Sequence, residues 1–345
     1  MGRRHRLLPE ARPRRVRRIA LFALVVLPGF GRDHIWDVEF FGYKDIDVAE
    51  IRKVIPVHEG DAFAGEETKD KVRKAVTASL GHEPTDVTAV CCNENRDFVL
   101  FIGLPGSSNR SFAYNGEPTG NSRLSDGLIT LDDRLKKAHD TAVQKGGESS
   151  REDDSNGYAL SLDPALRSLQ MTLRQYALAH EDELLRVLES SSDPRQRRIA
   201  GQALSYANKS AKQIEALVHT ARDVDFEVRN NAIRALGVLA LSDTKTAQQI
   251  PAGSFVEMLN SGTWSDRNKG SFLLYTLSRD RNPPLLAELR TIALDSLIEM
   301  AKWRDSPHAY EARVLLGRIA GIPEDRLRQL ASGPPDVILD ALQHQ

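Results

Sequence analysis

Cysteine is scarce in this sequence, and the two signs of charge nearly cancel. Two cysteines among 345 residues exclude a disulfide framework and a four-ligand structural zinc site. The formal net charge is −1, yet residues 1–18 hold eight Arg and one Glu, which leaves about −8 for the rest of the chain. An acidic body lacks the basic surface that binds nucleic acid, so we expect no nucleic-acid partner.

The motifs of common enzymes are also absent. The chain contains no Gly-x-Ser-x-Gly, His-Glu-x-x-His or Gly-x-Gly-x-x-Gly pattern, and its nine histidines lack the spacing of metal ligands. The densest titratable group, His180 with Glu181 and Asp182, falls between two predicted helices, where a solvated turn is expected. We therefore predict no catalytic residue, no cofactor and no metal site.

No apolar run in the sequence is long enough to cross a bilayer as a helix. The longest, at 19–30, has twelve residues and contains Pro28-Gly29, whereas a span needs about 20 residues. It directly follows the basic run, which is the order of an export signal. Residues 1–31 thus predict export to the periplasm or cell envelope. No small-x-small cleavage site follows, so an uncleaved anchor and a cytoplasmic chain stay open, and membrane contact is expected only through this segment.

Residues 32–104 are predicted to form a small α/β module. Trp36, Val38 and Phe40 alternate with acidic residues, the period of two that is typical of a strand with one buried face. A short helix after Asp47 and a longer one at 67–80 come next. Strands at 87–92 and 98–104, joined by a polar turn, complete the order strand, helix, helix, strand, strand.

This order, with Phe41-Gly42 closing the first strand and the sequence Gly-Asp-Ala-Phe at 60–63 between the helices, resembles a POTRA domain. A generic βααββ fold would give the same pattern. The resemblance implies a place outside the cytoplasmic membrane and the binding of partner segments, often by addition of a strand to the sheet edge.

Cys91 and Cys92 are adjacent at the end of a predicted strand. Neighbouring residues of a strand point to opposite faces, and a bond between them would distort the backbone. We therefore expect one buried and one exposed thiol, with a vicinal disulfide or a reactive thiol as the alternatives.

Residues 105–163 are predicted to be an irregular linker with one helix at 131–143, because Gly, Ser, Asn and Pro dominate its first part. Its acidic end partly matches a calcium loop through Glu152, Asp154, Asn156, Gly157 and Asp163. The match lacks the first Asp and the final bidentate Glu that such loops use. A solvated linker is therefore the preferred interpretation.

Residues 164–345 carry a helical repeat. The segments 193–204 and 225–236 superpose without gaps, each with Asp first, Arg four positions later and Ala-Leu at the end, and the register continues at 267–277 and 309–320. A period of 30 to 45 residues is typical of an α-solenoid. The Asp and Val-Arg pattern of Asp225, Val228 and Arg229 resembles HEAT repeats, which implies that these helices line the concave side.

The first residue of each segment is expected to cap its helix, and the arginine to reach an aspartate of the neighbouring unit. Val228, Ala232, Leu236 and Leu239 share one helical face and should form the core. Because each repeat contacts mainly its neighbours, we expect the repeats to fold without the α/β module.

Another stripe of the same helices points away from this core and should be exposed. If HEAT geometry holds, it forms a polar strip with one aromatic residue on the concave side, where a partner would bind. The predicted partner-binding residues are Arg198, Gln202, Glu227, Asn230, Arg234, Asn268 and Phe272.

The fold class is thus mainly α, a HEAT-like α-solenoid preceded by a small βααββ, POTRA-like module. The favoured function is a non-enzymatic scaffold or adaptor of the cell envelope that binds protein partners. The alternative is a HEAT-like lyase or cofactor-handling accessory that uses Cys91 or Cys92 as its nucleophile.

Overall fold

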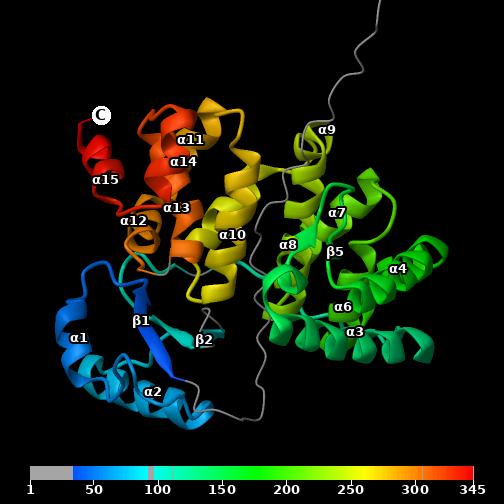
Figure 1. Cartoon of the computed structure of the whole chain (residues 1–345), viewed down its shortest axis with the longest axis horizontal. Coiled ribbons are helices and arrows are strands. Elements are labelled where there is room, and N and C mark those ends of the chain that lie inside the picture. The colour runs from blue at the N-terminus through cyan, green and yellow to red at the C-terminus, as the bar shows by residue number, and fades with distance from the viewer. Residues whose placement is uncertain (1–33, 92–96, 111, 305, 345) are drawn as a thin grey trace, which may run out of the picture.

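The computed structural model describes residues 34–91, 97–110, 112–304 and 306–344 and shows a mainly α-helical protein with one small sheet. An α/β module packs against a curved stack of helix pairs (Figure 1). The predicted fold class is confirmed. The proposed export segment, residues 1–31, lies outside the described residues. In the part of the chain that the structure describes, no helix has the length and apolar character to cross a membrane.

The α/β module has the predicted order of elements. It consists of β1 (Ile35–Phe41), α1 (Val48–Val54), α2 (Glu66–Leu80), β2 (Asp86–Cys91) and β3 (Phe98–Gly103). The strand order is β1-β3-β2, with β1 parallel and β2 antiparallel to β3. Asp47 caps α1 by accepting a 2.9 Å hydrogen bond from the Ala49 amide, and Gly81 ends α2 at φ 74°.

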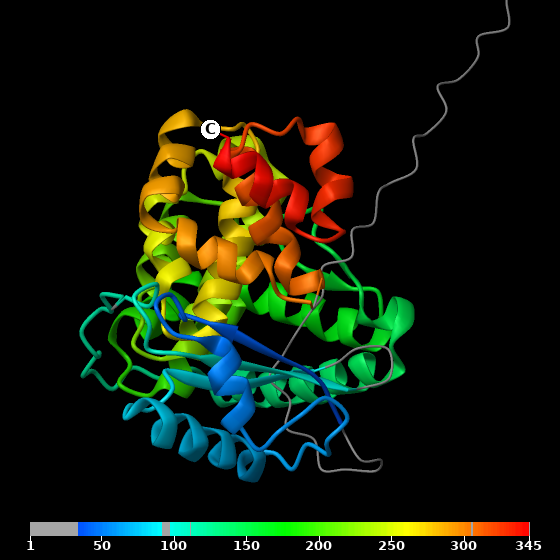
Figure 2. The same ribbon diagram turned by 90° about the vertical axis from the view of Figure 1, so that its left-hand side faces the viewer.

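The two faces of the sheet bury different sets of side chains. On one face, Phe40 and Leu100 form a core with Val72 and Val76 of α2. On the other face, Phe101 belongs to the core of the helical repeats. Figure 2 shows the strands lying between α2 and the repeat helices. Alternation along each strand therefore makes the sheet a shared layer between two cores.

The repeats are four pairs of helices. The pairs are α5 (Glu181–Ser190) with α6 (Pro194–Leu204), α7 (Ala211–Thr220) with α8 (Phe226–Ser242), the 3-10 helix η2 (Ala252–Asn260) with α10 (Trp264–Leu277), and α12 (Leu294–Ala301) with α13 (Ser306–Ile319). The second members, α6, α8, α10 and α13, contact one another in sequence and are here called the inner helices. They contain the four segments that the repeat pattern predicted.

Further helices flank or interrupt the stack. They are α4 (Pro164–Ala179), α9 (Thr244–Ala247), α11 (Pro283–Ile292), α14 (Glu324–Ala331) and α15 (Asp336–Gln343). Two of the helices, α11 and α12, are separate because the backbone of Ala293 between them leaves the helical region at φ −120°.

A ladder of buried arginines connects consecutive repeats. Arg197 donates two hydrogen bonds to Asp223 at 2.7 and 2.8 Å, and Arg229 donates two to Asp266 at 2.9 and 3.0 Å. Arg267 continues the ladder, 3.2 Å from a carboxylate oxygen of α12. The prediction that each arginine reaches an acid of the next unit is confirmed, although that acid differs from the helix-capping aspartate.

Residues 105–110 and 112–125 form an extended segment, here called the strap, that runs along the repeats. Its backbone pairs with the turn between the two helices of the third, second and first repeat in succession. These bonds run from the Arg110 amide to the Asn260 carbonyl at 2.9 Å, from the Asn115 amide to the Arg222 carbonyl at 2.7 Å, and from the Ser192 amide to the Gly120 carbonyl at 2.9 Å. The strap thus brings the chain from the module back to the first repeat.

The rest of the predicted linker is folded. It comprises α3 (Asp126–Lys145), the 3-10 helix η1 (Gly147–Ser150) and the short strands β4 (Glu152–Asp153) and β5 (Leu160–Ser161), which pair with each other. The expectation of a solvated linker is wrong, because Glu152 is 6% exposed and Leu128, Leu131 and Leu135 of α3 join the repeat core. Among the described residues, no cluster of His, Cys, Asp and Glu is arranged to hold a metal ion.

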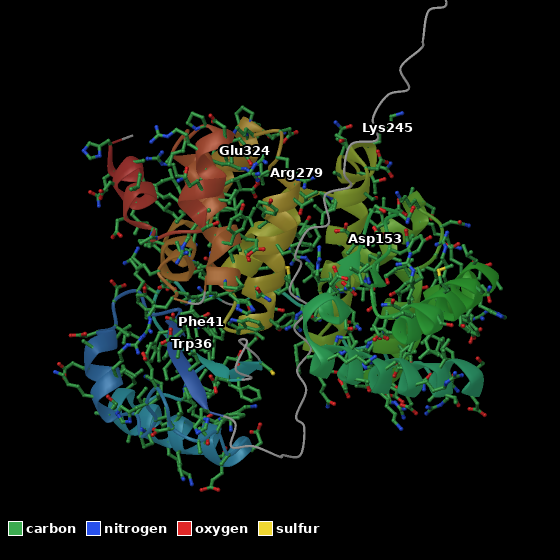
Figure 3. All side chains as sticks on the ribbon, viewed as in Figure 1. Trp36, Phe41, Asp153, Lys245, Arg279 and Glu324 are labelled. Atoms are coloured by element: carbon green, nitrogen blue, oxygen red, sulfur yellow. The ribbon has the colours of Figure 1, made fainter. Side chains whose placement is uncertain are left out.

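The module and the repeats share an aromatic core. The ring of Phe101 lies 5.0 Å from Trp264 and 4.9 Å from Trp303, measured between ring centroids. The Trp303 Nε1–H donates a 2.8 Å hydrogen bond to the Phe40 carbonyl, and Phe41 lies where the two parts meet (Figure 3). The sheet therefore covers both tryptophans, so the repeat core includes residues of the module, while folding of the repeats without the module stays a prediction.

Candidate functional site

The predicted strip begins on α6, where the protein's own α3 covers it. The Arg198 guanidinium donates a 2.7 Å hydrogen bond to Asp132, whose side chain is 2% exposed. Glu227 contributes a carboxylate oxygen 3.7 Å from Arg198 Nε. Arg198 is itself buried, so the expectation that it lies on an open surface is wrong.

On α8, Arg234 is engaged in the same way by the folded linker. Its Nη2 donates to Glu152, and the side chain is only partly exposed. Burial lowers the pKa of the neighbouring His139, against the opposing effect of Asp140. Gln202 on α6 and Asn230 on α8 are partly exposed. The α6 and α8 half of the strip is thus occupied by carboxylates of the chain itself.

On α10 the strip consists of Asn268 and Phe272, neither of which is paired with a carboxylate of a described residue. Asn268 is buried, and Phe272 is half-buried against α8. A methyl group added to Gly237 would come within 2.2 Å of Phe272 Cε1, so this glycine admits the ring between the two helices. Phe272 therefore packs on its own protein with one side and keeps the other side accessible.

Two charged residues that the strip omitted lie on this half. Lys269 on α10 and Glu311 on α13 are 42 residues apart, and each is partly exposed. Burial, and then the charge of Arg234, lower the pKa of Lys269 to about 8. Burial raises the pKa of Glu311 to about 7, with Lys269 opposing. Neither forms a salt bridge with any residue that the structure describes.

The sequence does contain a signal for this pair. The same offset of 42 that relates Leu274 to Leu316 relates Lys269 to Glu311, so the two residues occupy equivalent repeat positions. The charge of each residue acts on the pKa of the other, so the two lie near each other. Burial shifts both pKa values toward neutrality, which is the behaviour expected of groups in a recess.

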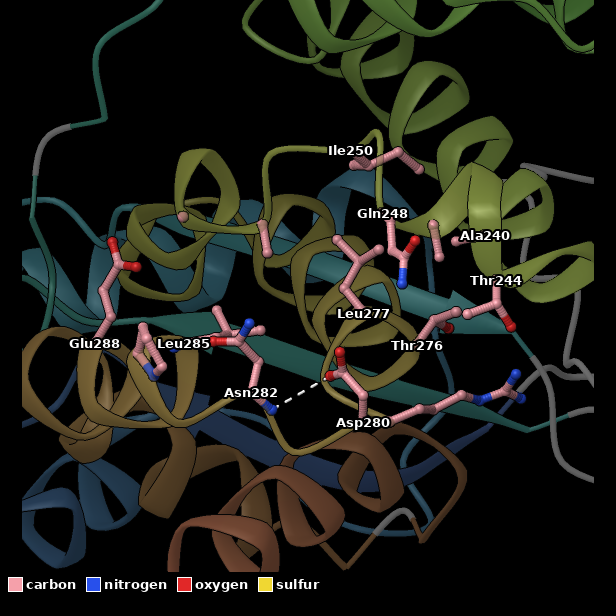
Figure 4. Close-up of a pocket in the computed structure, with 15 residues that line it drawn as sticks. Ala240, Thr244, Gln248, Ile250, Thr276, Leu277, Asp280, Asn282, Leu285 and Glu288 are labelled. Atoms are coloured by element: carbon pink, nitrogen blue, oxygen red, sulfur yellow. Dashed lines mark hydrogen bonds between the residues drawn. The ribbon is translucent and has the colours of Figure 1, made fainter.

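A separate cavity of about 390 Å³ lies at the C-terminal ends of α8 and α10. Figure 4 shows it between Thr244, Gln248, Asp280 and Glu288, with the Asn282 amide donating a 3.2 Å hydrogen bond to Asp280. No residue of the predicted strip lines it. Its wall mixes isolated polar groups with apolar ones and does not converge on a reactive group.

The cysteines differ from the prediction. Cys91 is disulfide-bonded. Cys92 lies outside the described residues. The expectation of a free thiol is therefore wrong for Cys91, at which strand β2 ends. Cys91 is thus not a free thiol nucleophile of the kind that the alternative function uses.

Comparisons with known proteins gave matches among solved structures only. No family model matches the chain. No curated protein matches it either. Among solved structures, an engineered protein is 19% identical with a TM-score of 0.39 and covers 64% of this chain and 100% of that one. A designed armadillo repeat protein in complex with the peptide (KR)4 is 16% identical with a TM-score of 0.35, covering 53% and 87%. The α-solenoid assignment rests on the helix pairs described above.

Proposed function

We propose that this protein is a non-enzymatic scaffold that binds a protein partner on the inner helices α10 and α13. One observation carries the proposal. Carboxylates of the chain itself occupy Arg198 and Arg234 on α6 and α8, whereas Lys269 and Phe272 on α10 remain partly exposed beside Glu311. Stacked helix pairs offer extended binding surfaces of this kind.

We further propose HEAT-type and POTRA-type relationships for the two parts. The arginine ladder between repeats supports the first. The module's order of elements supports the second, as does the sheet order, in which β2 pairs with β3 alone among the described strands. An edge strand of this kind accepts an added strand from a partner.

A place in the cell envelope belongs to the same proposal, with membrane contact only through residues 1–31. The basic and then apolar order of that segment supports it. The disulfide at Cys91 supports it independently, because disulfides persist mainly in oxidising compartments.

Photo-crosslinking tests the binding site. The full-length protein carries p-benzoylphenylalanine at Phe272 or, as a control, at Val337, which is 51% exposed on α15. After irradiation in cells, a discrete crosslinked species is expected from position 272 and not from 337, provided that both variants melt like the wild type. Identical patterns at the two positions, or no crosslink at 272, would remove the partner from the inner helices.

A further inference from the structure

The chain itself shows what chemistry its inner helices recognise. Two carboxylates of the segment between the module and the repeats form salt bridges with arginines of the inner helices. Asp132 lies 2.7 Å from Arg198, and Glu152 is paired with Arg234. Asp132 is 2% exposed and Glu152 is 6% exposed. Charge-assisted hydrogen bonds of this type are among the stronger polar contacts in proteins, so this face is already a carboxylate-binding surface along half of its length.

The next inner helix, α10, carries a lysine on which the charges of Glu311 and Glu152 act, although no described carboxylate forms a salt bridge with it. Lys269 follows Arg198 and Arg234 on the next inner helix and has no salt bridge to any described residue. Burial and the charge of Arg234 disfavour its protonated form and lower its pKa to about 8. A partly desolvated ammonium without a partner is costly, and a carboxylate from outside would relieve that cost.

The surroundings of Lys269 select the anion. Phe272 lies three residues further on the same helix face and offers a half-buried ring to an apolar side chain. Glu311 on α13 lies near enough for its charge to act on Lys269. A second negative charge would repel a dianion such as a phosphate more than a single carboxylate. A basic segment would be repelled by Lys269, whereas Arg234 is already paired with Glu152.

We infer that the inner helices α10 and α13 bind an acidic segment of a partner protein. An Asp or Glu carboxylate of this segment pairs with Lys269, and a neighbouring apolar side chain packs against Phe272. This inference rests on the proposed function, since it names the chemistry of the partner at the same site. The carboxylates of α3 and β4 cover α6 and α8. The partner segment would place a further carboxylate over α10 and α13 in the same way.

Selection from a random phage-displayed 12-residue peptide library on the immobilised full-length protein tests the inference. Peptides that depend on Phe272 are identified by loss of binding to Phe272→Leu. We expect these peptides to be enriched in Asp and Glu. Their affinity should fall about 10-fold to 100-fold in Lys269→Gln, the usual loss for a hydrogen bond to a charged group, and should not change in Lys245→Gln, an exposed lysine on α9.

The substitution Glu311→Gln should change the peptide affinity in the opposite direction to Lys269→Gln. It removes the competing negative charge and should strengthen binding of the acidic peptides, which a loss of structure cannot do. Peptides that depend on Phe272 but are neutral or basic, or that ignore Lys269→Gln, would overturn the acidic-segment inference and leave the proposed binding site intact. The absence of any peptide that depends on Phe272 or Lys269 would overturn both.

Discussion

The carboxylate of Glu299 on α12 accepts a 2.7 Å hydrogen bond from the backbone amide of Gly42, at the end of β1. Its other oxygen accepts bonds of 3.0 Å from the amides of Tyr43 and Lys44. The last arginine of the ladder, Arg267, lies 3.2 Å from the same carboxylate. One buried side chain thus joins the fourth repeat, the third repeat and the α/β module.

Removing the charge of Glu299 should destabilise the protein strongly. In Glu299→Gln one of the two acceptor oxygens is replaced by an NH2 group, which cannot accept the backbone hydrogen bonds. Arg267 then remains buried without its counter-charge. We expect the free energy of unfolding to fall by about 3 to 5 kcal/mol, as measured by urea denaturation. Asp295→Asn is the control on the same helix, because its pair with Lys44 is half exposed and should contribute little to stability. Equal losses in the two variants would contradict the assigned role of Glu299.

The helical repeats should be destabilised when the module is removed. A fragment of residues 160–345 uncovers Trp264 and Trp303, which are 5% and 1% exposed in the full chain, and also loses α3. We expect a lower melting temperature by circular dichroism and red-shifted tryptophan fluorescence relative to the full chain, because apolar surface of this kind is buried on folding. A fragment with the melting temperature of the full chain would show that the repeats are independent after all.

The sequence predicted local structure better than it predicted long-range contacts. The repeat register is visible in the sequence as a recurring pattern and is correct. The capping aspartates Asp193 and Asp225 depend only on neighbours within one helix and are also correct. The free strip and the independent repeats depend on where residues 105–161 return, and composition carries no information on that path. Arg198 and Asp132 are 66 residues apart, so no periodicity within a helix relates them.

Lys269 and Glu311 illustrate the intermediate case. Their equivalence follows from the repeat offset. Their shifted pKa values follow from burial, which depends on how the helices pack and cannot be read from the sequence alone.

The arginine ladder should show strong pairwise coupling. Arg229→Ala leaves Asp266 buried at 1% exposure without its partner and should cost about 3 kcal/mol. A double-mutant cycle with Asp266→Ala should give a coupling energy of about 1 to 3 kcal/mol, measured by denaturant unfolding. The exposed pair of Arg195 and Asp133 serves as the control and should couple by less than about 1 kcal/mol. A ladder pair that couples no more than this control would mean that the arginines do not connect the repeats energetically.

The stability of the module should depend on pH through Glu39. Burial, and then the charge of Asp37, raise the pKa of Glu39 to about 8 from its ordinary value of 4.5. The folded protein therefore keeps a proton on this carboxyl that the unfolded chain has lost. This contribution to stability is complete below about pH 4.5 and is lost as the pH rises through 8.

Glu39→Gln keeps the neutral form at every pH, and its amide oxygen can still accept from the Arg304 amide that contacts Glu39. Its stability relative to the wild type should rise between pH 5 and 8 by more than about 1 kcal/mol, since one pKa unit corresponds to roughly 1.4 kcal/mol. Thermal unfolding at a series of pH values measures this difference. A difference that stays flat or falls over the range would exclude a buried, protonated Glu39.

Substitution of glycine by alanine should have opposite effects on stability at two positions of adjacent inner helices, Gly237 on α8 and Gly201 on α6. The difference arises because Phe272 packs against Gly237. In Gly237→Ala the new methyl group would come within 2.2 Å of Phe272 Cε1, so the ring or the helix must move, and overpacking of this kind costs about 1 to 3 kcal/mol. A methyl group added to Gly201 on α6 would have its nearest neighbour, Leu188 Cδ2, at an ordinary contact distance of 3.6 Å. Gly201→Ala should therefore stabilise the protein by about 0.5 to 1 kcal/mol through the lower backbone entropy of the unfolded chain. Differential scanning calorimetry of the two variants checks the signs. Stabilisation by both substitutions would show that Phe272 does not need the space over Gly237, and would leave the ring free to turn wholly toward a bound partner.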